Sequence, residues 1–184
     1  MTSASEHKPA RVPVIGVMGS GADSHPVRAA AIGGWIAENG FHLLNGGGGG
    51  VMASVSRAFF EHSPRAGRVI GVLPCLPEHH PPDAPLGYPN PWVEIPIRTH
   101  LPLSGTHGTE AMSRNHINVL SADVIVALPG GQGTLSEVKL ALEYRRPVIA
   151  YLIDPSEIPG LPEAVTVTSE LDGVAEFVLK HLVR

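Results

Sequence analysis

The residues best suited to bind an anion lie in the stretch 129–137, which reads PGGQGTLSE. Gly130, Gly131 and Gly133 let the backbone come within contact distance of a bound group, because no Cβ stands in the way. Apolar residues at helical spacing follow, and the N-terminus of a helix offers unpaired N–H groups and a partial positive charge. This stretch therefore predicts a site for a phosphate or another anion.

Two more glycine-rich turns follow apolar stretches of the strand type. One is Gly19-Ser20-Gly21, after the run 12–18, and the other is the unbroken glycine run from Gly46 to Gly50, after the run 41–44. The bland alternative is that these glycines only form tight turns, although consecutive glycines at a strand end are costly in chain entropy. Ligands of parallel sheets bind at the carboxyl ends of the strands, so the three turns are expected to converge on one ligand.

The elements that must position these turns alternate along the chain. Strands are expected at 12–18, 41–44, 68–73, 123–128 and 147–152, with short ones near 92–97 and 165–167. Helices are expected at about 26–39, 51–59, 110–120, 135–142 and 174–181. Near-continuous apolar strands alternating with helices predict a single α/β domain, a Rossmann-like doubly wound parallel sheet with helices on both faces.

Domain boundaries follow from composition. We expect a flexible N-terminal tail at 1–11 and the Rossmann-like nucleotide- or cofactor-binding domain at 12–184. Prolines recur in an insertion at about 74–108, where they exclude a regular helix. A loop of this length inside a compact domain is usually functional or an oligomer contact.

Composition excludes several kinds of partner. The 184 residues are 43% hydrophobic and 16% charged, with a net charge of −4 and no Lys/Arg cluster, so neither nucleic acid nor an anionic membrane is an expected partner. The start is polar and no apolar run reaches the length of a membrane span, which predicts a cytoplasmic protein. The one cysteine, Cys75, cannot form an internal disulfide, and the ten histidines are scattered without zinc-type spacing, so no metal site is expected.

Standard nucleotide motifs fit poorly. The first turn reads G-x-G-x-x-S and lacks the third glycine of a dinucleotide site, and Asn45 stands where an acidic residue would hold a ribose. No G-K-[ST] follows any glycine run, which disfavours a P-loop. Thr134 and Glu137 also match the S/T-x-x-E capping box, in which they would only close the start of a helix. A phosphate at that helix start would repel a capping carboxylate, so a phosphate site predicts that Glu137 turns toward the sugar or base.

The motif around Gly130 resembles that of a known group. Residues 129–134 with Glu137 are similar to the P-G-G-x-G-T-x-x-E motif of the Lonely Guy family, Rossmann-like phosphoribohydrolases that release the base from cytokinin nucleoside 5′-monophosphates. In that family an arginine on the preceding helix works with the motif glutamate, and Arg114 has the matching spacing. Asn115 replaces the family's lysine, the glycine run is one residue shorter, and the motif helix is shorter.

With Asn115, the shorter glycine run and the shorter motif helix, the chain resembles more closely the molybdenum cofactor carrier proteins of the same superfamily. The segments that carry this resemblance are 15–19, 70–74, 113–121 and 137–142. It implies binding of a phosphorylated small molecule, a nucleotide or a pterin, by a homodimer or homotetramer that carries or stores a molybdenum cofactor. The ligand itself stays unknown, with molybdopterin as one candidate.

The alternative that the resemblance leaves open is a nucleoside 5′-monophosphate phosphoribohydrolase acting on AMP or cytokinin monophosphates. Arg114 and Glu137 would then be catalytic, with Glu137 stabilising the positive charge that develops on the ribose. A third possibility is a nucleotide sensor. For either ligand we expect contacts from Gly19, Ser20, Gly21, Gly46, Gly47, Gly48, Met112, Arg114, Gly130, Gly131, Gln132, Gly133, Thr134 and Glu137.

Other residues are weaker candidates. His107 and His116 are close to Arg114 in sequence and could face the same pocket. Tyr88 and Trp92, in the proline-rich insertion, could stack on a base or fill a subunit interface. Cys75 is expected to be a small buried residue, and the pair His79-His80 to be solvated.

Overall fold

The computed structural model describes residues 11–76, 78 and 83–182. The predicted tail, apart from Arg11, and the pair His79-His80 lie outside these residues. The strands are β1 (Val14–Met18), β2 (His42–Asn45), β3 (Val69–Leu73), β4 (Ile95–Arg98), β5 (Val124–Ala127), β6 (Val148–Tyr151) and β7 (Thr166–Thr168). The α-helices are α1 (Pro26–Glu38), α2 (Gly50–Glu61), α3 (Asn115–Ser121), α4 (Gln132–Glu143) and α5 (Leu171–Leu182), with short 3-10 turns η1 (Gly105–His107) and η2 (Pro155–Glu157).

All the strands form one parallel sheet of seven strands, in the order β4-β3-β2-β1-β5-β6-β7. The chain builds outward from β1 to β4, returns across the sheet, and builds outward again from β5 to β7. This is the predicted Rossmann-like doubly wound fold, which the structure confirms. The direction of winding reverses between β1 and β5, and such a switch point opens a crevice at the carboxyl ends of the strands.

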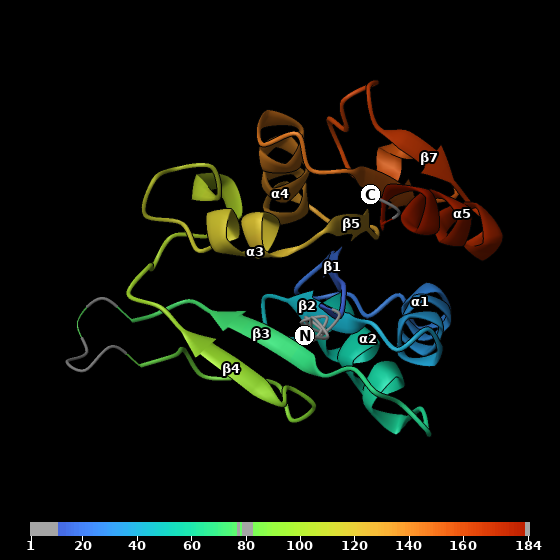
Figure 1. Cartoon of the computed structure of the whole chain (residues 1–184). Coiled ribbons are helices and arrows are strands. Elements are labelled where there is room, and N and C mark those ends of the chain that lie inside the picture. The colour runs from blue at the N-terminus through green and yellow to red at the C-terminus, as the bar shows by residue number, and fades with distance from the viewer. Residues whose placement is uncertain (1–10, 77, 79–82, 183–184) are drawn as a thin grey trace, which may run out of the picture.

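Helices cover both faces of the sheet (Figure 1). On one face α1, α2 and α5 pack against apolar side chains such as Ile15 and Val17, which are fully buried. On the other face α3 and α4 cover a second apolar cluster that includes Met18 and Ile125. Residues next to each other on a strand point to opposite faces, which explains why β1 serves both clusters.

The structure corrects the sequence prediction in the region before β5. The helix expected at 110–120 begins only at Asn115, and Arg114 is its N-cap residue. Residues 110–113 form turns instead, because Ser113 forms a bridge with Leu103 and its N–H donates to the Glu110 carbonyl at 2.9 Å. The segment 99–114 is thus an irregular loop that includes η1, which packs against α4, and the loop is visible in Figure 1 beside α3.

Among the described residues, no helix is both long and apolar enough to cross a membrane.

Candidate functional site

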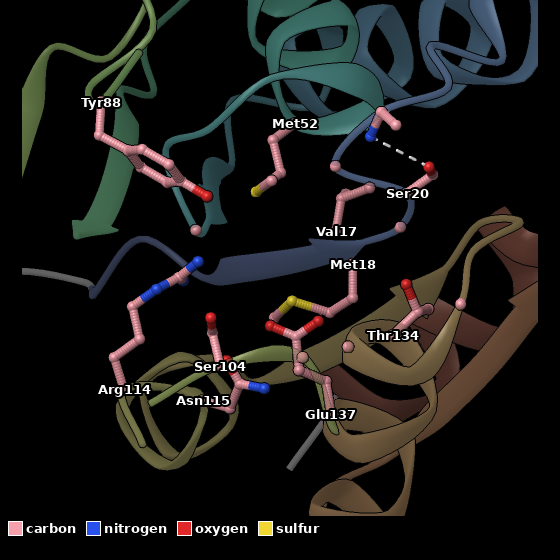
Figure 2. Close-up of a pocket in the computed structure, with 17 residues that line it drawn as sticks. Val17, Met18, Ser20, Met52, Tyr88, Ser104, Arg114, Asn115, Thr134 and Glu137 are labelled. Carbon is pink, nitrogen blue, oxygen red and sulfur yellow. Dashed lines mark hydrogen bonds between the residues drawn. The ribbon is translucent and has the colours of Figure 1, made fainter. Parts of the chain in front are cut away.

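A cavity of about 300 Å³ opens at the carboxyl ends of β1 and β5 (Figure 2). The three glycine turns and the loop before α3 surround it, as the topology predicts. Its lining comprises Val17, Met18, Gly19, Ser20, Gly21, Ala22, Gly46, Met52, Tyr88, Ser104, Gly105, Arg114, Asn115, Gly131, Gly133, Thr134 and Glu137.

Most of the residues predicted to contact a ligand line this cavity. They are Gly19, Ser20, Gly21, Gly46, Arg114, Gly131, Gly133, Thr134 and Glu137. The predicted contacts Gly47, Gly48, Met112, Gly130 and Gln132 do not line it. Met112 is 45% exposed, because it precedes the late start of α3 and so lies outside the pocket wall.

Two glycines behind the wall have a supporting function. Gly47 has φ +74°, a conformation that glycine adopts without strain, and its N–H donates to the Asn45 side chain at 2.8 Å. A Cβ on Gly48 would lie 2.7 Å from the Tyr88 ring. The glycine run therefore shapes the wall through Asn45 and Tyr88, in addition to exposing backbone at Gly46.

The start of α4 has no side-chain cap. Its N-cap residue is Gly131, and the predicted capping box is wrong: Thr134 and Glu137 lie inside the helix. The helix begins at Gln132, two residues before Thr134, so neither side chain can reach back to the first N–H groups in the way the box requires. The first turn of α4 thus presents backbone donors to the cavity, which suits an anionic ligand.

Arg114 is a buried residue of the cavity wall. The residue is 5% exposed, and its Nε and Nη1 atoms have no hydrogen-bond partner among the described residues. A Cβ on Gly46 would lie 2.3 Å from Nη1, so only glycine leaves room for the guanidinium. Burial of an unpaired charge costs free energy, and an anion bound in the cavity would offset that cost.

Glu137 faces the same cavity and is 8% exposed. Its Oε1 accepts a hydrogen bond of 3.0 Å from Asn118 Nδ2. Burial raises the pKa of Glu137, while the positive charge of Arg114 and the bond from Asn118 partly oppose that rise. Asn118 is not among the predicted contacts, although its spacing of one helical turn from Arg114 was a usable signal.

The loop before α3 packs against α4 and forms part of the cavity wall. The Ser136 hydroxyl lies 3.1 Å from the Gly105 carbonyl, and Ser104 and Gly105 are both lining residues. The two nearby histidines do not reach the cavity. His107 pairs with Glu110 at the surface, and His116 Nδ1 lies 2.6 Å from the Tyr144 hydroxyl.

Cys75 is buried, as expected, and lies outside the lining of the cavity. Within the part of the chain that the structure describes, no three His, Cys, Asp or Glu side chains are placed to hold a metal ion.

An ion pair fixes the turn at Gly130 from behind. Arg28 on α1 donates two hydrogen bonds to Glu157, at 2.7 and 2.6 Å, and the Glu157 carbonyl accepts the Gly130 N–H at 3.1 Å. The bonds from Arg28 lower the pKa of Glu157 to about 2. The pair is mostly sheltered, with side-chain exposures of 15% and 25%.

We expect Glu157→Gln to lower the free energy of unfolding by about 2 kcal/mol at pH 7. This value is smaller than the full free-energy equivalent of the pKa shift, because the ion pair is partly exposed to solvent. A carboxylate with a depressed folded-state pKa stabilises above its ordinary value of 4.5 and loses that contribution as pH falls toward 2. Urea unfolding of wild type and variant at pH 7, 5 and 3.5 measures this, and the gap should narrow only below about pH 4.5. Glu61→Gln, in the exposed pair with Arg57, is the control and should change stability little at any pH. A gap for Glu157→Gln that stays constant from pH 7 to 3.5 would contradict the assignment.

The fold and the cavity define the class of protein: a Rossmann-like domain that presents a glycine-rich, small-molecule-sized cavity at its topological switch point. The chain belongs to the SLOG cluster4 family, which it matches over residues 12–173. The resemblance to the Lonely Guy-like superfamily is thereby confirmed.

Similar proteins include molybdenum cofactor proteins of known structure. The molybdenum cofactor binding protein of Rippkaea orientalis is 33% identical, with a TM-score of 0.75, over 95% of this chain and 100% of that one. The molybdenum cofactor carrier protein of Chlamydomonas reinhardtii is 34% identical, with a TM-score of 0.70, over 94% of this chain and 98% of that one. An uncharacterized protein of Archaeoglobus fulgidus is 33% identical over 149 residues, which are 80% of this chain and 84% of that protein.

Proposed function

We propose that this protein binds a phosphate-bearing nucleotide or pterin-type cofactor in the cavity and carries it without breaking a bond, as a molybdenum cofactor carrier or storage protein. One observation carries the proposal: buried Arg114, whose Nε and Nη1 have no hydrogen-bond partner among the described residues, faces the same cavity as the uncapped start of α4. Both features favour an anionic ligand. The similarity to two molybdenum cofactor proteins over nearly the whole chain supports a pterin-type ligand. The proposal includes a cytoplasmic location and a homodimer or homotetramer.

The lining fits such a ligand chemically. Thr134 and the backbone at Gly131 supply polar groups, and the Thr134 hydroxyl is buried with no partner among the described residues. Met18, Met52 and Tyr88 supply apolar and aromatic surface for a ring. Polar groups that converge on a cavity beside apolar and aromatic side chains are typical of a cofactor site.

The state of Glu137 favours carriage over hydrolysis. Cleavage of an N-glycosidic bond builds positive charge on the ribose, which an ionised carboxylate stabilises. Burial raises the pKa of Glu137 and so disfavours its ionised form.

Hydrolysis is the second candidate, because Arg114 and Glu137 line the same cavity as the phosphoribohydrolase resemblance requires. In that case Glu137 would stabilise the ribose cation or activate water, and the start of α4 would hold the 5′-phosphate.

Incubation of the purified protein with AMP and with a cytokinin 5′-monophosphate distinguishes the two functions, with released base measured by chromatography. For a carrier we expect no base above background and AMP binding that survives Glu137→Gln, since the amide keeps the shape of the side chain. Pterin fluorescence after oxidation of the purified protein, with mass spectrometry, tests for the proposed cargo. Base release that is abolished by Glu137→Gln but kept by Glu143→Gln, an exposed position on the same helix, would establish the hydrolase instead.

A further inference from the structure

Tyr88 is the aromatic side chain that the proline-rich insertion contributes to the cavity, in addition to Ser104 and Gly105 near the end of the insertion. Its ring lies against Gly48, where a Cβ would approach the ring to 2.7 Å. The guanidinium carbon of Arg114 lies 5.9 Å from the ring centroid, within the range of a cation–π contact. The aromatic ring therefore forms part of the wall that also holds Arg114.

Hydrogen bonds fix the segment that carries Tyr88. The Asn90 N–H donates to the Gly47 carbonyl at 2.7 Å, and its side-chain Nδ2 donates to the Gly48 carbonyl at 2.9 Å. Asn90 is only 5% exposed, and the Tyr88 N–H donates to the Pro85 carbonyl at 3.1 Å. The insertion is thus anchored on the glycine run, two residues from Tyr88.

The cavity has two chemically different ends (Figure 2). Thr134 lies at one end, at the uncapped start of α4, and its hydroxyl and the first N–H groups of the helix suit a phosphate. Ser20 lies at the same end, where its hydroxyl accepts the Asp23 N–H at 2.9 Å. Tyr88 and Arg114 lie at the other end, and Met52 projects from α2 toward the same space. A planar ring with polar edges matches this second end, because aromatic and thioether groups pack on its face and a guanidinium can bond its edge.

We propose that Tyr88 determines ligand specificity by packing its aromatic ring against a planar heterocycle whose phosphate is held at the start of α4. This inference rests on the proposed function, because it assumes that a phosphorylated heterocyclic ligand occupies the cavity. It also gives the insertion a function, which is to supply the surface that selects a ring-bearing ligand over a bare sugar phosphate.

Binding of AMP and of ribose 5-phosphate, measured by calorimetry, tests this inference, because the two probes share the phosphate and sugar and differ in the ring. Tyr88→Leu, which keeps apolar bulk against Gly48, should lower AMP affinity about tenfold, as loss of aromatic stacking does. Its affinity for ribose 5-phosphate should stay within about twofold. Tyr88→Phe should bind AMP like wild type, because the ring remains. Leu86→Ala, at a fully exposed position of the same segment, is the control and should bind both probes like wild type.

The outcomes separate the inference from the proposed function. If Tyr88→Leu loses equal affinity for AMP and for ribose 5-phosphate, or loses affinity for neither, the inference is overturned and the proposed function stands. A loss in Tyr88→Phe as large as in Tyr88→Leu would overturn stacking in favour of a bond from the hydroxyl. If wild type binds neither AMP nor ribose 5-phosphate, nor carries a pterin, the proposed function fails and the inference fails with it.

Discussion

Replacement of Arg114 by methionine is expected to lower AMP affinity about a hundredfold, because the ligand loses charge-assisted hydrogen bonds that contribute about 3 kcal/mol to binding. The unliganded variant should nevertheless be at least as stable as wild type. The reason is that Nε and Nη1 of the buried guanidinium have no hydrogen-bond partner in the described part of the chain, so the apolar side chain removes a desolvation cost. Calorimetric titration with AMP and urea unfolding without ligand measure the two effects.

Arg57→Met is the matched control for this prediction. Arg57 lies on α2 outside the cavity lining and pairs with Glu61 at the surface, so its loss should change neither AMP affinity nor stability by much. A variant Arg114→Met that binds AMP like wild type, or that unfolds far more easily without ligand, would contradict the role assigned to the guanidinium. Unchanged AMP affinity would mean that Arg114 does not contact the ligand. Reduced stability without ligand would mean that Arg114 stabilises the fold.

Gly131→Ala is expected to weaken AMP binding about tenfold, the cost of one extra methyl group in a filled site. The φ of Gly131 is −95°, which alanine also adopts, and a Cβ there would meet no protein atom within 4 Å. The methyl group would therefore extend into the cavity at the start of α4, where the ligand phosphate is proposed to lie. Thermal unfolding without ligand should give the same Tm for variant and wild type, while calorimetry shows the loss of affinity.

Gly34→Ala provides the corresponding control. A Cβ on Gly34, in α1, also meets no atom within 4 Å, but Gly34 is not part of the cavity lining. This variant should bind AMP like wild type and be slightly more stable, because alanine favours a helix more than glycine does. If Gly131→Ala binds AMP as tightly as Gly34→Ala does, the phosphate is not at the start of α4.

The sequence was sufficient to predict the sheet and the convergence of its turns. Buried apolar runs such as 124–127 and 148–151 are typical of parallel strands, and such strands end at one edge of the sheet. The turns at Gly19, Gly46 and Gly131 consequently meet because of topology rather than proximity in sequence.

The predictions that were wrong, the capping box of α4 and the start of α3, depend on the residue at which each helix begins. The pattern Thr134-x-x-Glu137 fits a helix start and also the inside of a helix, and only the position of Gly131 as N-cap residue decides between them. Met112 was placed on a helix by its apolar spacing, but the bridge between Leu103 and Ser113 delays α3. Ser104 and Gly105 carried no sequence signal, because an irregular loop is positioned by the elements against which it packs.

The pairing of β1 with β5 has a consequence for how the protein is made. The Val14 N–H donates to the Asp123 side chain across 109 residues of chain, and the cavity takes groups from both sides of that junction. Contacts so distant in sequence close late in folding, because a long loop must be ordered before they form. On the ribosome the site therefore remains incomplete until the residues of α4 have emerged, and neither half of the chain contains all of its lining. A ligand that binds only the completed site should shift the folding equilibrium toward the native state.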